Sequence, residues 1–134
     1  MMAEDDSNWS DILGWGEEER QELRYAGYSF YREGRYEQAH TFFSALVVLD
    51  SKSLYDQQTL GAIHLQLGNN EKALDFLNEA LKIDPTDETT LLNKTKALLM
   101  IGKKNDALAI ANRLQRSADP YLSNDAQALL LAYS

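Results

Sequence analysis

The sequence contains no cysteine, only two prolines and no long apolar run. Without cysteine, the chain can form no disulfide and offers no thiolate as a nucleophile or metal ligand. Because a helix needs roughly 20 consecutive apolar residues to span a bilayer, we expect no stable insertion into a membrane. The scarcity of proline argues against a loop-rich chain, and the absence of cysteine is compatible with a reducing cytoplasm.

Clustered basic residues are also missing. Seven of the acidic residues and no basic residue lie in residues 1–19, whereas the rest of the chain holds fourteen acids and thirteen bases. Nucleic-acid binding depends on neutralising phosphates with a basic surface, so we expect no nucleic-acid partner. The first six residues include three acids and no base, unlike the basic start of a secretory signal, and this supports a cytoplasmic location.

The feature that the sequence does have is an internal repeat of 34 residues. The repeated positions are a glycine and, five residues later, an alanine: Gly34 with Ala39, Gly68 with Ala73, and Gly102 with Ala107. Each glycine lies where a helix would end in the left-handed conformation, before a short turn into a second helix. A lone helix pair cannot bury its apolar face, so the repeat predicts three pairs stacked into a curved, all-α solenoid.

These positions are those of the tetratricopeptide repeat, a family that the sequence resembles over residues 20–121. We expect repeats at 20–53, 54–87 and 88–121, an acidic amino-terminal segment with a short helix at 1–19, and a carboxy-terminal capping helix at 122–134. The middle repeat matches best, with Leu60, Gly61, Gly68, Ala73, Ala80 and Pro85 at the family's positions. In the third repeat, Thr95 replaces the glycine that lets the two helices approach.

No group of residues predicts catalysis. The two histidines, His40 and His64, belong to different repeats with no nearby ligand set, and we expect them on the surface or in the groove. A metal site needs three or four convergent ligands, so we predict no metal and no cofactor. The sequence also lacks a phosphate-binding loop and a Gly-x-Ser-x-Gly motif. We therefore expect a protein that is not an enzyme and has no catalytic residues.

The resemblance implies a partner-binding groove, because in these proteins the first helix of each pair lines the concave face. By repeat position, the groove residues are Arg24, Tyr28 and Tyr31 from the first pair, Tyr55, Gln58, Ala62 and Leu65 from the second, and Leu92, Lys96 and Leu99 from the third. Most of them are apolar or aromatic, which is typical of surfaces that bind another protein. The alternative for individual tyrosines and leucines is a place in the core between repeats.

Two segments suggest what the partner is. Residues 31–40, together with Phe43, Leu46 and Leu49, resemble the translocator chaperones of bacterial type III secretion. Residues 112–120 instead resemble the chaperone of the secretion needle subunit, a family that usually works with a second small protein. Both resemblances imply a bacterial cytoplasmic chaperone that keeps a hydrophobic or self-associating secreted protein soluble before export. The client, a co-chaperone and a homodimer stay open, and a generic scaffold for folded proteins is the competing interpretation.

The amino-terminal segment has an apolar face of its own. Trp9, Ile12 and Leu13 are spaced as on one side of a short helix, and the second tryptophan, Trp15, follows closely. This segment can cap the first repeat, serve as a dimerisation arm or plug the empty groove.

Overall fold

The computed structural model describes residues 12–134, and the part of the chain that it describes is helical without strands, as the sequence predicts. From Glu17 onward, the helices are α2 (Glu17–Arg32), α3 (Tyr36–Leu49), α4 (Leu54–Gln66), α5 (Asn70–Ile83), α6 (Glu88–Met100), α7 (Lys104–Leu114) and α8 (Pro120–Tyr133). The expected segment around Trp9 lies mostly outside the described residues. None of these helices is long and apolar enough to cross a membrane.

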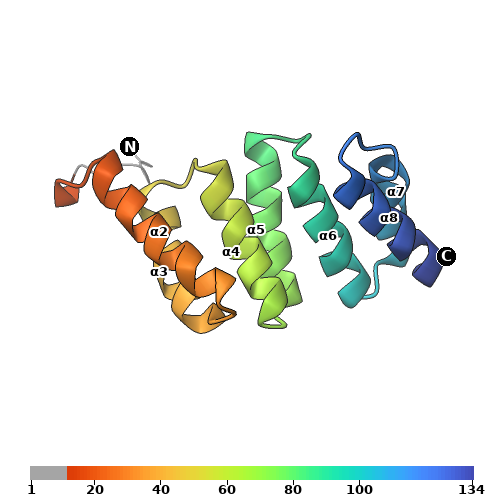
Figure 1. The fold of residues 1–134 in the computed structure, drawn as a ribbon, viewed down its shortest axis with the longest axis horizontal. Helices are drawn as coiled ribbons and strands as arrows, with labels where there is room; N and C mark the ends of the chain where they lie inside the picture. The colour runs from red at the N-terminus through yellow and green to blue at the C-terminus, as the bar shows by residue number, and fades with distance from the viewer. Residues whose placement is uncertain (1–11) are drawn as a thin grey trace.

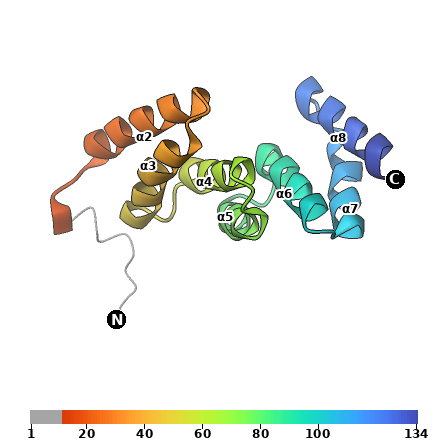
Figure 2. The same cartoon turned by 90° about the horizontal axis from the view of Figure 1, so that it is seen from below.

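The helices stack as three antiparallel pairs in a row, α2 with α3, α4 with α5 and α6 with α7, followed by α8 (Figure 1). Figure 2 shows the row as an arc, with α3, α5 and α7 along the outer edge and α2, α4, α6 and α8 along the inner edge. The all-α solenoid of three helix pairs with a carboxy-terminal capping helix is therefore confirmed. Helix α2 begins at Glu17, three residues before the expected repeat, and the capping helix α8 begins at Pro120, two residues before the expected cap.

The repeated glycine ends the first helix of each pair. Gly68 has a φ of +81°, a left-handed conformation that glycine adopts without strain from a side chain. Its N–H donates to the carbonyl of Leu65 at 3.1 Å, and the N–H of Asn69 donates to the carbonyl of His64 at 2.8 Å. These two bonds form a Schellman motif, which satisfies carbonyls that the helix end leaves free. Gly34 and Gly102 occupy the same conformation, so the 34-residue period reports this turn.

Glycines of a second kind let the two helices of a pair pack closely. A Cβ on Gly61 would lie 2.7 Å from Leu77, and one on Gly27 would lie 2.8 Å from the ring of Phe43. In the third pair, Thr95 is fully buried, and its hydroxyl donates to the carbonyl of Leu91 at 2.9 Å. A threonine is therefore buried at this position without an unpaired hydroxyl, because its own helix supplies the acceptor.

The core runs along the row from pair to pair. Phe43 and Leu46 of the first pair pack with Leu60 and Ile63 of the second. At the other end, Ala126 of α8 is buried in one cluster with side chains of α6 and α7. The contact between the pairs supplies the apolar burial that a single pair lacks, and α8 covers the last pair as the sequence predicts.

Candidate functional site

The predicted groove residues lie on the three inner helices. The set comprises Arg24, Tyr28 and Tyr31 of α2, Tyr55, Gln58, Ala62 and Leu65 of α4, and Leu92, Lys96 and Leu99 of α6. Some of these residues line a hollow on the inner side of the arc, whereas others make contacts within the fold.

A hollow of roughly 260 Å³ lies on the inner face between the ends of α2, α4 and α6. Four predicted residues line it, namely Tyr31, Ala62, Leu65 and Lys96. Gln66, Asn93 and Met100 of α4 and α6 also line it, together with Gly68 and Asn70, which repeat position did not place in the groove. The lining therefore combines apolar side chains with amide groups and one ammonium group. Such a mixture suits an apolar side chain of a partner and the polar backbone beside it.

The tyrosines form an aromatic strip along α2 and into α4. Tyr28 and Tyr31 have ring centroids 6.4 Å apart, and the guanidinium of Arg32 lies 5.9 Å from the centroid of the Tyr28 ring. Tyr28 and Tyr55 are each 41% exposed. Burial raises the pKa values of Tyr31 and Tyr55 above the ordinary value, which already leaves a phenol neutral at physiological pH. The strip therefore offers partly exposed rings with hydroxyl groups, which is common at protein-binding surfaces.

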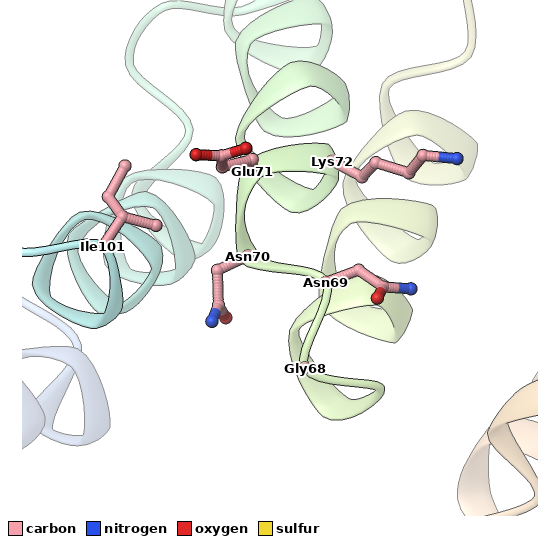
Figure 3. Close-up of a pocket in the computed structure, with 6 residues that line it drawn as sticks. All are labelled: Gly68, Asn69, Asn70, Glu71, Lys72 and Ile101. Atoms are coloured by element: carbon pink, nitrogen blue, oxygen red, sulfur yellow. The ribbon is translucent and has the colours of Figure 1, made fainter.

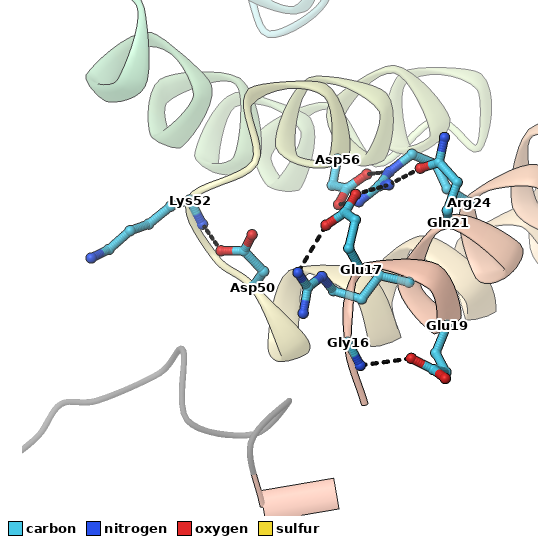
Figure 4. Close-up of polar contacts among 9 residues, drawn as sticks. Gly16, Glu17, Glu19, Gln21, Arg24, Asp50, Lys52 and Asp56 are labelled. Atoms are coloured by element: carbon cyan, nitrogen blue, oxygen red, sulfur yellow. Dashed lines mark hydrogen bonds and ion pairs between the residues drawn. The ribbon is translucent and has the colours of Figure 1, made fainter. Parts of the chain in front are cut away.

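Arg24 lies on the inner face, but its charge is used inside the molecule (Figure 4). Its Nε and Nη2 donate to the two carboxylate oxygens of Asp56 at 2.7 and 2.8 Å, and Asp56 is fully buried. The hydrogen bond with Asp56 raises the pKa of Arg24, and Glu17 and Gln21 add further contacts. Arg24 therefore joins the first pair to the second and is not a free cation for a partner.

The remaining predicted residues also take part in the fold. Leu92 is only 7% exposed because it packs in the core of the third pair, so it offers little surface to a partner. Gln58 donates to Asp87 at 3.2 Å and so connects α4 to the start of α6. Lys96 is 3.9 Å from Asp125, but its side chain is 44% exposed. Leu99 is half-buried.

The two histidines form part of the contact between the first two pairs, and the prediction of a surface or groove position is wrong for His64. The His64 ring is 3% exposed, meets the His40 ring edge-on with centroids 4.9 Å apart, and stacks on Phe76 at 5.3 Å. Burial, with His40 and Lys72 nearby, lowers the pKa of His64. Within residues 12–134, no three potential ligands gather as a metal site would require.

A second hollow lies at the turn between α4 and α5 and shares Gly68 and Asn70 with the first. Figure 3 shows Asn70 and Glu71 on the side of Ile101, whereas Asn69 and Lys72 point the other way. This hollow is open and is bordered mainly by polar turn residues. An apolar segment would gain little burial there, so we do not assign it to the site.

The sequence matches one known repeat family. The model of the tetratricopeptide repeat matches residues 59–87, most of the second pair. No curated protein matches the chain.

Solved structures resemble the whole fold. A type III secretion complex from Aeromonas hydrophila has a TM-score of 0.80 at 23% identity, covering 92% of this chain and 84% of that one. The translocator chaperone SycD of Yersinia enterocolitica, in complex with a peptide of the translocator YopD, has a TM-score of 0.76 at 22% identity, covering 89% and 98%. PcrH, a protein of Pseudomonas aeruginosa, in complex with the chaperone-binding region of PopD, has a TM-score of 0.76 at 26% identity, covering 90% and 94%. SycD also appears as an alternative dimer. The predicted resemblance to tetratricopeptide-repeat chaperones of type III secretion is confirmed by these neighbours.

Proposed function

We propose that this chain, which has the tetratricopeptide-repeat fold of the type III secretion translocator chaperones, is itself a bacterial cytoplasmic chaperone of that secretion system. It binds a hydrophobic segment of a secreted protein on its inner face and keeps that protein soluble before export. The observation that carries the proposal is the hollow lined by Tyr31, Ala62, Leu65 and Lys96, next to the aromatic strip of Tyr28 and Tyr55.

The composition of the hollow fits a segment of a client rather than a folded surface. Ala62 and Leu65 supply apolar contact area, and burying an apolar side chain there removes it from water. Asn93 and Gln66 have amide groups at the border of the hollow that can pair with a peptide backbone. Covering the apolar segment of an unexported protein in this way prevents its self-association.

A translocator is the favoured client. Two of the similar structures hold translocator peptides or chaperone-binding regions, those of YopD and PopD. The resemblance of residues 112–120 to needle-subunit chaperones stays a prediction, and in this chain the segment connects α7 with α6 and α8. Ser117 donates to Glu88 at 2.6 Å, and Asp119 caps α8 by accepting from the N–H of Tyr121 at 2.9 Å. A second small protein acting as co-chaperone is not part of this proposal.

A capture experiment separates a chaperone from a generic scaffold. The bait protein is compared with a groove pair, Tyr28→Ala with Leu65→Ala, and with an outer pair, Val48→Ala with Ile83→Ala. The outer pair removes apolar side chains that are 54% and 41% exposed on the convex helices α3 and α5. Proteins retained from a lysate of the source bacterium are identified by mass spectrometry, and circular dichroism checks that all baits keep their helicity.

The proposal expects a secreted, aggregation-prone protein that is retained by the wild type and the outer pair and lost from the groove pair. Folded, soluble partners lost only from the outer pair would replace it with the scaffold interpretation. Equal retention of the secreted protein by all three baits would show that the inner face does not bind it.

A further inference from the structure

An apolar cleft of roughly 480 Å³ lies at the amino-terminal edge of the solenoid, away from the groove. Its lining residues are Leu13, Trp15, Leu23, Ser44, Ala45, Val48 and Leu49. Almost no polar surface faces it, because the one hydroxyl in the lining, that of Ser44, is hydrogen-bonded to the His40 ring at 3.3 Å. Val48 and Leu13 are 54% and 52% exposed. In a solenoid, such an edge is where a preceding repeat would stack.

We propose that the side chain of Trp9 occupies this cleft, so that the amino-terminal segment of the same chain covers the edge of the first pair. Trp9 lies outside the described residues, and the chain enters the description at Ile12, beside the cleft. Three residues span at most about 10 Å, which keeps the indole within reach. The tether also gives Trp9 a high effective concentration at the cleft compared with any separate molecule.

The register of the segment supports this occupant. Ile12 and Leu13 are helical, and Leu13 already lines the cleft. One further turn of helix would bring Trp9 to the side of Leu13, because residues four apart share a helix face. Trp9 is the large aromatic residue of residues 1–11, and an indole buries a large apolar area.

Charge argues against a second copy as the occupant. Residues 1–19 carry seven acidic residues and no basic residue, and the whole chain has a net charge of −8. Two copies that meet at this edge would bring their acidic segments together, which repulsion disfavours. The same acids favour an intramolecular cover, because Glu4, Asp5 and Asp6 precede Trp9 and can stay in water while the indole is buried.

The fluorescence of Trp9 tests the proposal in the purified, client-free chain. The signal of Trp9 is taken as the difference between the wild type and Trp9→Phe, which leaves Trp15 in the lining of the cleft. Its emission maximum and acrylamide quenching are compared with those of a peptide of residues 1–11. Two further changes are added separately: Val48→Gln makes the cleft polar, and Ala45→Phe fills it. Leu131→Gln is the control, because Leu131 is an apolar residue of α8 that is 85% exposed. Circular dichroism confirms that each variant is folded.

We expect Trp9 to emit at shorter wavelength than in the peptide and to be quenched less. Both effects should be lost with Val48→Gln and Ala45→Phe, unchanged with Leu131→Gln and independent of protein concentration. Quenching equal to that of the peptide would overturn the proposal. Protection that appears only as the mass doubles would assign the cleft to a second copy, and protection that Val48→Gln and Ala45→Phe leave intact would place Trp9 elsewhere. None of these outcomes depends on a client, so they leave the proposed chaperone function to its own test.

Discussion

Replacing Arg24 by methionine removes one partner from a buried ion pair at the contact between the first two helix pairs. Asp56 is 0% exposed and receives two charge-assisted hydrogen bonds from Arg24, at 2.7 and 2.8 Å. A buried carboxylate without its countercharge typically destabilises a protein by about 3–5 kcal/mol. The side chain of Arg24 is 17% exposed, so water reaches the pair. We therefore expect a loss near the lower end, about 3 kcal/mol.

Urea denaturation followed by far-ultraviolet circular dichroism measures this loss, as a lower midpoint with an unchanged slope. Lys82→Met is the matched control. The Lys82–Glu79 pair is also 2.7 Å long, but its side chains are 73% and 50% exposed. Exposed pairs of this kind contribute about 0–0.5 kcal/mol. The comparison therefore holds the distance between the charged atoms constant and varies their burial.

The double variant Arg24→Met with Asp56→Leu completes the test. Replacing both charges by apolar side chains removes the desolvation penalty together with the attraction, so this variant should be more stable than Arg24→Met alone. A loss of stability in Arg24→Met no larger than that in Lys82→Met would contradict a stabilising role for the buried pair, as would a double variant less stable than Arg24→Met.

Three further predictions concern packing, the turn and pH. Gly61→Ala should lower the free energy of unfolding by about 1–2 kcal/mol, measured in urea, because the new Cβ would lie 2.7 Å from Leu77; an unchanged midpoint would contradict the close packing. Gly68→Ala should cost about 1 kcal/mol by the same measurement, because its φ is +81°, and a stabilised variant would argue against this turn. The pKa of His64 is lowered in the folded chain, so the unfolded chain binds more protons and stability falls as the pH drops below the ordinary histidine value near 6.5. Thermal melts across this range should show a smaller decline for His64→Gln than for the wild type, and equal declines would exclude His64 as the cause.

The architecture was predictable because it depends on local signals that recur. Gly34, Gly68 and Gly102 mark the same left-handed helix end in each pair, and the chemistry of that turn can be read from sequence alone. The capping role of α8 was predictable from its apolar spacing, and Ala126 is buried against the third pair as expected. The exact starts of α2 and α8 were less accurate, since helix ends shift by a few residues with the capping contacts available.

The site was only partly predictable, because repeat position gives a helix face and not the contacts across pairs. Arg24 occupies a groove position, yet its partner Asp56 lies 32 residues away and is fixed only by how two pairs stack. Leu92 occupies another, but the packing of the third pair buries it. His64 was misplaced for the same reason, because its contacts with His40 and Phe76 join three different helices.

If the inner face keeps a secreted protein soluble, the solubility of that client must depend on the side chains of the inner face. A hydrophobic translocator encoded by the same genome is co-expressed with the wild type, with Leu65→Glu and with Ile83→Glu, and the fraction of translocator in the soluble lysate is measured. Leu65 lines the hollow of the inner face, whereas Ile83 is an exposed residue of the outer helix α5. We predict that the translocator is soluble with the wild type and Ile83→Glu and aggregates with Leu65→Glu. Two results would contradict this function for the inner face. One is a translocator as soluble with Leu65→Glu as with the wild type, and the other is a translocator that aggregates even with the wild type.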